Sequence, residues 1–167
     1  TKPLGVGLVA TAQKRGLADQ ADFQRALKQM ITLNSLGASL GSLPGVKAMT
    51  DVSGFGLLGH LTEVCEGSGV SATVDSARVP RLENVDRYID ADCTSGGTDR
   101  NFDSYGQKIS ALSKRQKALL CDPQTSGGLL VAVASDGLTA FEEASAGLGL
   151  ESFGHITEAA EPLITVN

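Results

Sequence analysis

The sequence predicts one domain of the mixed α/β class, with helices packed on a sheet. Three observations lead to this prediction. The length of 167 residues suits a single domain with its own core. Segments whose apolar residues recur at helical spacing alternate with short segments of strand character. No linker or internal repeat interrupts this alternation, which is typical of an α/β domain.

Helical spacing of apolar residues occurs in five segments, of which the second has the clearest face. There Phe23, Leu27, Met30 and Ile31 lie on one side, and Gly37 is expected to end the helix. The five segments are 7–17, 22–37, 56–69, 82–89 and 136–149.

The third and the last of these helices follow the same rule. Leu57, Leu58, Leu61 and Val64 form an apolar face in the third, which Gly67 is expected to end. In the last helix the residues expected to point inward are Leu138, Phe141 and Ala144, with Gly149 beyond its end.

Strand character marks the other ordered regions. Val46, Ala48, Thr50 and Val52 alternate as in a half-buried strand. A continuous apolar run of strand length follows later in the chain, at 128–134. Further strands are expected at 70–75 and as two pieces within 151–167.

Composition excludes several classes of partner. The net charge of −5 and the pI near 5.0 argue against nucleic acid and against anionic membrane surfaces. Only 4% of residues are aromatic and Trp is absent, so a base-stacking platform is not expected either. No apolar run approaches the roughly 18 to 20 residues of a membrane span.

The cysteines indicate a reducing compartment. They are three in number, widely spaced and without CxxC pairing, so we expect reduced thiols in a cytoplasmic protein instead of disulfides or a zinc site. They are Cys65, Cys93 and Cys121. Because the first residue is Thr, we also expect the chain to be part of a longer protein.

Two short patterns match known sites only in part. Gly5, Gly7 and Ala10 fit the GxGxxA dinucleotide fingerprint, but the strand and the acidic residue that it requires are not visible, so a closely packed turn is favoured. His60 and Glu63 have the i, i+3 spacing of a metal-binding pair on a helix. No second pair is present, so we expect His60 to be an ordinary, partly exposed residue.

Two glycine-rich segments could contact phosphate. In CDPQTSGG the hydroxyls of Thr125 and Ser126 precede Gly127 and Gly128, and the backbone N–H groups of such a turn can bind an anionic oxygen. The alternative is a tight turn that leads into a buried strand. The second segment, SGGTDRN, lies in residues 93–107, whose composition predicts a loop. Its candidate phosphate contacts are Gly97, Thr98, Arg100 and Asn101, and the alternative is a flexible loop without a ligand.

Asp51 lies at a glycine-rich hinge, TDVSGFGLLGH, followed by Gly54, Gly56 and Gly59. It could cap the helix that follows, as Ser53 could. It could also be an oxygen ligand of Mg²⁺, with small neighbours that leave room for a phosphate. One carboxylate does not hold the ion alone, so other ligands would have to come from elsewhere.

Four stretches resemble the selenophosphate synthetase family, also called the selenide, water dikinases. They are KPLGVGLVATA, MTDVSGFGLLGHLTE, GGTDRN and LLCDPQTSGGLLVA, in register from Lys2 to about Ala134. The similarity is to the C-terminal domain of these enzymes, which belong to the aminoimidazole ribonucleotide synthetase superfamily. It implies that residues 1–167 are a single C-terminal α/β (α+β) domain, with a mixed sheet flanked by helices in α/β/α layers.

The family consumes ATP, selenide and water, and forms selenophosphate, AMP and phosphate. The resemblance implies that Asp51 is the one Mg²⁺ ligand from this half of the enzyme, and that both glycine-rich segments lie near the phosphates. The residues concerned are Thr125, Ser126, Gly127, Gly128, Gly97, Thr98 and Asn101. It also implies that ATP is held mainly by an N-terminal half not included here, in a cytoplasmic homodimer.

The chain departs from the family pattern in one respect. None of its cysteines is followed three residues later by Lys, so the family's Cys-x-x-Lys nucleophile is missing. We therefore expect no catalytic residue in this chain, and no activity of the chain alone. The alternatives are another member of the superfamily, such as a purine-pathway synthetase, a hydrogenase-maturation protein or a thiamine-phosphate kinase, and a non-catalytic binding module.

Overall fold

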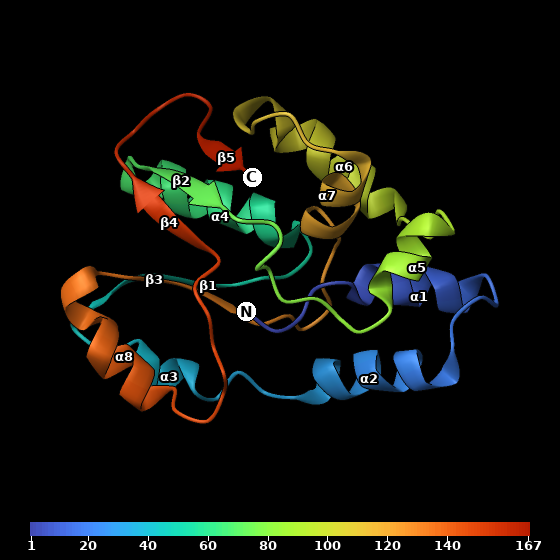
Figure 1. The fold of residues 1–167 in the computed structure, drawn as a ribbon, viewed down its shortest axis with the longest axis horizontal. Coiled ribbons are helices and arrows are strands. Elements are labelled where there is room, and N and C mark those ends of the chain that lie inside the picture. The colour runs from blue at the N-terminus through green and yellow to red at the C-terminus, as the bar shows by residue number, and fades with distance from the viewer.

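The structure is a computed structural model that describes residues 1–167, and it confirms the mixed α/β class (Figure 1). The α-helices are α1 Val6–Lys14, α2 Gln20–Ile31, α3 Gly37–Leu40, α4 Gly56–Ser68, α5 Val85–Asp90, α6 Gly96–Tyr105, α7 Lys114–Leu120 and α8 Leu138–Ala144. The strands are β1 Val46–Asp51, β2 Ser71–Val74, β3 Leu129–Val133, β4 Gly154–Thr157 and β5 Ile164–Val166. Two short 3-10 helices cover Gly106–Lys108 and Ser135–Gly137.

The strands form two sheets instead of one. β1 and β3 pair antiparallel, with Asp51 opposite Leu129 at one end. β2 lies between antiparallel β4 and parallel β5, so this second sheet is mixed. In Figure 1 the β1–β3 pair crosses the middle of the molecule, below the three-stranded sheet. Helix α4 contacts both β1 and β2, so it connects the two sheets.

A single cluster of 27 buried residues forms the apolar core. Leu8 of α1 and Leu57 and Leu58 of α4 are fully buried in it, as is Val52, directly after β1. Burial of an aliphatic side chain of this size stabilises the fold by about 1.5–3 kcal/mol. The core thus holds the chain on both sides of the turn that follows Asp51. No helix is both long and apolar enough to cross a membrane.

Two predicted helix ends are wrong. α2 ends at Ile31, where Thr32 turns the backbone to an extended conformation, and Gly37 begins α3 instead of ending α2. α4 continues past Gly67 and is ended by Gly69, whose φ is 66°. Gly69 has the left-handed conformation that closes a helix, so the glycine chosen from the sequence was two positions too early.

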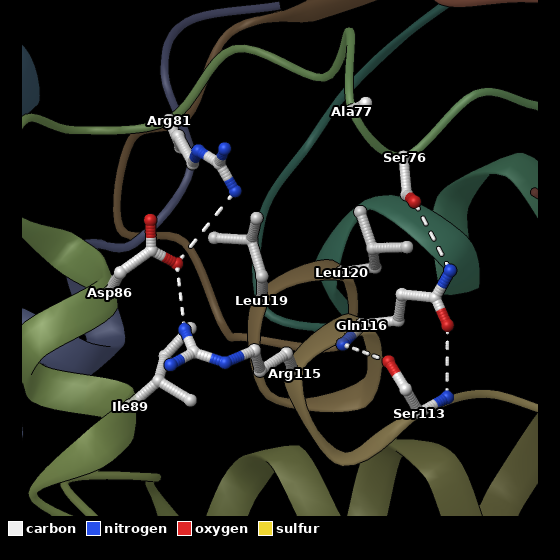
Figure 2. Close-up of a pocket in the computed structure, with 10 residues that line it drawn as sticks. All are labelled: Ser76, Ala77, Arg81, Asp86, Ile89, Ser113, Arg115, Gln116, Leu119 and Leu120. Carbon is white, nitrogen blue, oxygen red and sulfur yellow. Dashed lines mark hydrogen bonds and ion pairs between the residues drawn. The ribbon is translucent and has the colours of Figure 1, made fainter.

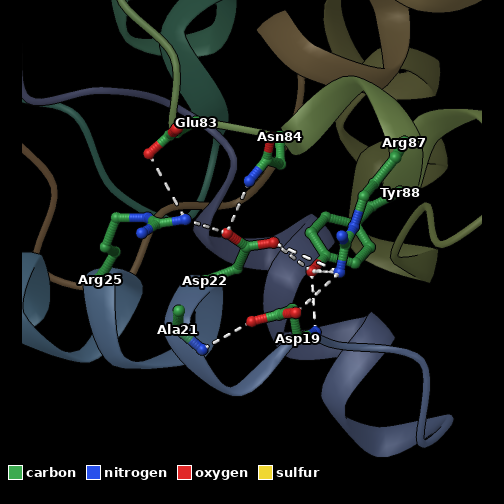
Figure 3. A network of polar contacts seen from close by, with 8 residues as sticks. All are labelled: Asp19, Ala21, Asp22, Arg25, Glu83, Asn84, Arg87 and Tyr88. Carbon is green, nitrogen blue, oxygen red and sulfur yellow. Dashed lines mark hydrogen bonds and ion pairs between the residues drawn. The ribbon is translucent and has the colours of Figure 1, made fainter.

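The predicted apolar face of α2 is confirmed in part, because Phe23 and Met30 pack against the core. The prediction is wrong for Ile31, and the helix also buries a charged residue. Ile31 is 79% exposed, whereas Asp22 is 2% exposed. Asp22 accepts hydrogen bonds from the Tyr88 hydroxyl at 2.6 Å and from the Asn84 amide at 3.1 Å, and it pairs with Arg25 (Figure 3). Since Tyr88 lies on α5, this network joins α2 to α5, in addition to the apolar contacts of α2 with the core.

The prediction of a loop at 93–107 is wrong, because Gly96–Tyr105 form α6. Its buried residues are Thr98, Asn101 and Tyr105, which are three and four positions apart on one helical face. Helix α6 packs on α4 and α7. Two of the three inward side chains are polar, so apolar periodicity did not reveal the helix.

The predicted inward face of α8 is also wrong. Leu138 and Ala144 are exposed, and Phe141 is only half-buried. The closest packing at this end is backbone on backbone, since a Cβ added to Gly137 would lie 2.4 Å from the Cα of Gly45. The chain is thus packed here by the contact between Gly137 and Gly45, and not by the apolar face that the spacing predicted.

Candidate functional site

Three segments that are distant in sequence meet beside the end of β1. The backbone N–H of Val52 donates to the carbonyl of Gly128 at 2.8 Å, and that of Gln124 donates to the carbonyl of Ser53 at 3.0 Å. The side-chain amide of Asn101 donates to the carbonyl of residue 54 at 2.9 Å. We call this arrangement the hinge site, formed by residues 51–56, 96–101 and 121–128.

Most glycines of the hinge site serve chain packing. A Cβ on Gly127 would lie 1.9 Å from the carbonyl oxygen of Val52, and one on Gly56 would lie 2.8 Å from the backbone of Cys121. Gly56 also has a φ of 72°, which favours glycine. Gly54 differs, because it is exposed and a Cβ there would meet no atom within 4 Å. At Gly54 the backbone is open to a ligand.

The tip of CDPQTSGG presents two hydroxyls. Thr125 and Ser126 are both exposed. Ser126 has a φ of 52°, a conformation that residues other than glycine seldom adopt and that recurs at functional sites. The Lys2 ammonium holds it by donating to the carbonyls of Ser126 and Thr32, each at 2.7 Å. The backbone of the tip is therefore fixed, while its hydroxyls face solvent.

Helix α6 contributes its buried face to the hinge site. Thr98 and Asn101 are buried, and the amide of Asn101 donates to the carbonyls of Gly54 and Cys121 at 2.9 and 3.0 Å. Gly97 lies against the proline ring of CDPQTSGG, where a Cβ would come within 2.6 Å of the ring. These contacts fix the turn after Asp51 and the CDPQTSGG segment against the buried face of α6.

Asp51 ends β1 with an exposed carboxylate that has no hydrogen bond or ion pair within the chain. Helix α4 begins at Gly56, with Phe55 as its N-cap and no side-chain capping bond, so neither Asp51 nor Ser53 caps it. An unpaired carboxylate beside open backbone fits a hard cation, which prefers oxygen ligands. No cluster of three His, Cys, Asp or Glu side chains could hold a metal, so other ligands would have to come from outside the chain.

Asp122 is the buried carboxyl of the hinge site. Its Oδ2 accepts from the backbone N–H of Gly7 at 2.9 Å and from the Gln124 amide at 2.8 Å, while its buried Oδ1 has no partner. Burial raises the pKa of Asp122 to about 7, although these hydrogen bonds favour the charged form. A Cβ on Gly7 would lie 2.4 Å from Oδ1. The GVGLVA segment thus packs closely, as predicted, but the prediction of a turn is wrong, because the segment forms the start of α1.

His60 is 7% exposed, so the prediction of a partly exposed residue is wrong. Its Nε2 lies 3.2 Å from the Ser53 hydroxyl, and its Nδ1 lies 3.1 Å from a Glu63 carboxylate oxygen. The Phe55 ring packs edge-on against it, with ring centroids 5.9 Å apart. His60 and Glu63 do share one side of α4, as their spacing predicted, but they contact each other and Ser53 instead of forming a metal cluster.

A pocket of about 310 Å³ lies elsewhere, between α5 and α7 (Figure 2). Its two arginines, Arg81 and Arg115, both face the carboxylate of Asp86, at 3.7 and 3.3 Å. Arg115 also pairs with Asp90. Because both guanidinium groups are already paired with carboxylates, no free positive charge in this pocket is available to bind a phosphate. We therefore place the candidate site at the hinge.

A protein-family model covers nearly the whole chain. Residues 1–166 match the family described as AIR synthase related protein, C-terminal domain. The chain belongs to this family. The fold class that the motifs implied is therefore confirmed.

Relatives of the chain are selenide, water dikinases. It is 58% identical to that of Pseudomonas putida over 151 residues, which cover 90% of the chain and 44% of the relative. It is 50% identical to that of a Sulfurovum species over 168 residues, or 99% of the chain and 49% of the relative. The resemblance inferred from the four stretches is thus confirmed. The chain spans about half the length of the curated relatives it matches.

Solved structures share the fold at low sequence identity. Thiamine-monophosphate kinase from Stenotrophomonas maltophilia matches with a TM-score of 0.64 and 20% identity, over 99% of this chain and 48% of that one. Hydrogenase maturation protein HypE in complex with ATP matches with a TM-score of 0.60 and 17% identity, over 98% and 42%. At these identities the likeness establishes the fold alone.

Proposed function

We propose that this chain is the C-terminal domain of a selenide, water dikinase, which forms selenophosphate, AMP and phosphate from selenide, ATP and water. The observation that carries the proposal is the identity of 50–58% to selenide, water dikinases over at least 90% of the chain. The name of these relatives itself implies phosphoryl transfer to selenide and to water.

In this proposal Asp51 is the single Mg²⁺ ligand that the chain supplies. Its exposed, unpaired carboxylate at the end of a fixed strand supports the assignment. When bound, Mg²⁺ neutralises charge on the phosphates during phosphoryl transfer. The open backbone at Gly54 leaves room for a phosphate near this carboxylate.

The two glycine-rich segments take different parts. Thr125 and Ser126 contact phosphate oxygens, because their hydroxyls are exposed and free of partners in the chain. Gly127 and Gly128 lie in the fixed turn, where a Cβ on Gly128 would lie 2.0 Å from the backbone nitrogen of Lys2. Gly97 and Asn101 of α6 contact this segment, at the proline ring and at the carbonyl of Cys121, and Thr98 is buried on the same face of the helix.

The nucleophile and most of the ATP site belong to an N-terminal half in this proposal, within a cytoplasmic homodimer. The cysteines of the chain support this division, because all three are buried. Burial also raises the pKa of the Cys121 thiol to about 11, which suppresses the reactive thiolate. Residues 1–167 alone therefore have no selenide-dependent activity.

The test compares two proteins, the full-length gene product and residues 1–167 alone, by their release of AMP from ATP. We expect AMP and selenophosphate from the full-length protein only when selenide is present, and none from the isolated chain. A full-length protein that phosphorylates thiamine monophosphate instead, or forms no AMP with selenide, would contradict the proposed function. Turnover by the isolated chain would contradict the division of the site between two halves.

A further inference from the structure

Three side chains form a line of hydrogen bonds that reaches the hinge site. A Glu63 oxygen lies 3.1 Å from Nδ1 of His60, and Nε2 of His60 lies 3.2 Å from Oγ of Ser53. Val52 is fully buried, whereas Asp51 and Ser53 on either side of it are not. Ser53 therefore lies two residues beyond the end of β1, within the hinge site, and is separated from Asp51 by one buried residue.

The direction of each hydrogen bond follows from the chemistry of the groups. An ionised carboxylate only accepts, so Nδ1 of His60 carries the hydrogen that is donated to Glu63. Nε2 of the neutral ring is then bare and accepts the hydroxyl hydrogen of Ser53. The oxygen of Ser53 keeps its lone pairs for a hydrogen-bond donor in the hinge site.

The packing holds this line in place. His60 is buried on α4, with the Phe55 ring against it, so the imidazole has little freedom. The main chain of Ser53 is fixed through its carbonyl, which accepts from the N–H of Gln124 at 3.0 Å. Glu63 has a side chain that is 61% exposed and forms the outer end. A serine hydroxyl oriented by histidine and carboxylate is the arrangement that activates oxygen nucleophiles.

We propose that Ser53, His60 and Glu63 form a proton relay for the water molecule that the reaction consumes. The proposal rests on the proposed function, in which water attacks a phosphoryl group near Asp51. As the bond from the water oxygen to phosphorus forms, a water proton passes to Oγ of Ser53, and the Ser53 proton passes to Nε2 of His60. The bond from phosphorus to the leaving oxygen breaks, and that oxygen keeps the electron pair.

The three residues have distinct parts in the relay. Ser53 contacts the attacking water, and His60 receives the proton through Ser53. Glu63 is a positioning residue, because it fixes the Nδ1–H form of the ring and then stabilises the imidazolium. General-base catalysis of this kind contributes about 10²–10⁴-fold to a rate.

Kinetics of the full-length protein test the relay. In Ser53→Ala and His60→Gln we expect kcat for phosphate release to fall about tenfold or more, with KM for ATP and selenide changed less than about twofold. Glu63→Gln, at an exposed position, should give a smaller fall in kcat and an unchanged melting temperature. A rise in KM at constant kcat would overturn the proposal, since it would indicate a binding or purely structural role.

Two matched controls come from the same chain. Glu66→Gln changes an acidic residue one turn further along α4, which pairs with Lys108 instead of with His60. His155→Gln changes the other histidine, which is exposed on β4. Both should retain full kcat. Equal losses in these controls and in the three relay variants would overturn the proposal.

A spectroscopic measurement decides the relay independently of turnover. Two-bond ¹H–¹⁵N spectra of the ¹⁵N-histidine-labelled full-length protein at neutral pH should show the Nδ1–H tautomer for His60, with an Nε2 resonance that shifts in Ser53→Ala. An Nε2–H tautomer, or a resonance that Ser53→Ala leaves unmoved, would overturn the relay. If the unsubstituted protein forms no AMP with selenide, the proposed function fails, while these spectra still decide whether the relay exists.

Discussion

The backbone N–H of Val52 donates a hydrogen bond of 2.8 Å to the carbonyl oxygen of Gly128. This bond extends the pairing of β1 and β3 by one step beyond Asp51, which lies opposite Leu129. The carboxylate and the CDPQTSGG turn are thus held at the end of one antiparallel pair. Strand pairing, and not the loops alone, sets the distance between the candidate metal ligand and the candidate phosphate contacts.

Gly127→Ala should destabilise the protein without changing any polar side chain. The added Cβ would lie 1.9 Å from the carbonyl oxygen of Val52, so the strand end or the turn must move. Overpacking of this kind costs about 1–3 kcal/mol. We expect the midpoint of thermal unfolding to fall by several degrees. Gly54→Ala is the control, because no atom lies within 4 Å of its Cβ position; equal midpoints for the two variants would contradict the close packing.

Secondary structure could be predicted where apolar spacing decides it. The helix at Gly56–Ser68 follows from the sequence because its apolar residues face the core. The strands at Val46–Asp51 and Leu129–Val133 follow from an alternating pattern and an apolar run, although their apolar side chains are only half-buried. Helix α6 could not be predicted in this way, since Thr98 and Asn101 point inward. Helix α7 was not predicted either, although Ser113 and Gln116 form a capping box at its start.

Asp22→Asn should lower stability and leave turnover unchanged. Burial opposes ionisation of Asp22, but hydrogen bonds from Tyr88, Asn84 and Arg25 outweigh it and lower the pKa of the carboxyl. A lowered folded-state pKa stabilises the protein above the ordinary value of 3.8, and this contribution is lost as the pH falls through the lowered pKa. We expect the variant to lose about 1–3 kcal/mol at pH 7.

The pH dependence of this loss identifies its cause. The difference in unfolding free energy between Asp22→Asn and the unsubstituted protein should shrink when denaturation is measured at progressively lower pH. Glu83→Gln is the control, because the Glu83 side chain is 70% exposed and lies 3.5 Å from Arg25 at the edge of the network. A loss as large in Glu83→Gln, or one independent of pH, would contradict the role of the buried carboxylate.

The pKa of Asp122 is shifted in the opposite direction to that of Asp22, so Asp122→Asn should remove a loss of stability that occurs as the pH rises. The folded-state pKa of Asp122 is raised to about 7 from 3.8, so the folded protein retains a proton that the unfolded chain has lost between these values. Stability therefore decreases as the pH rises from about 4 to 7. The asparagine variant cannot ionise, so its stability relative to the unsubstituted protein should increase from pH 5 to pH 8 in denaturation experiments. A difference in unfolding free energy that stays constant with pH would contradict the raised pKa of the buried Asp122 carboxyl.

The hinge site was predicted in its composition but not in its internal contacts. The motifs identified Asp51, Thr125 and Ser126, which the structure places at exposed positions near one another in the fold. The burial of His60 and its contact with Ser53 could not be predicted, because they depend on how α4 packs against α6 and β1. The i, i+3 spacing predicted only that Glu63 lies beside His60 on the helix.

The substitution Asp51→Asn in the full-length protein tests most directly whether the hinge site binds the metal. Asparagine keeps the size and one oxygen but removes the charge that would offset Mg²⁺. We predict a fall in selenide-dependent AMP formation of about tenfold or more, equivalent to about 1.4 kcal/mol of transition-state stabilisation, with an unchanged melting temperature. Asp136→Asn, at an exposed position outside the site, should have no effect. Near-normal turnover with unchanged Mg²⁺ dependence in Asp51→Asn would contradict the assignment.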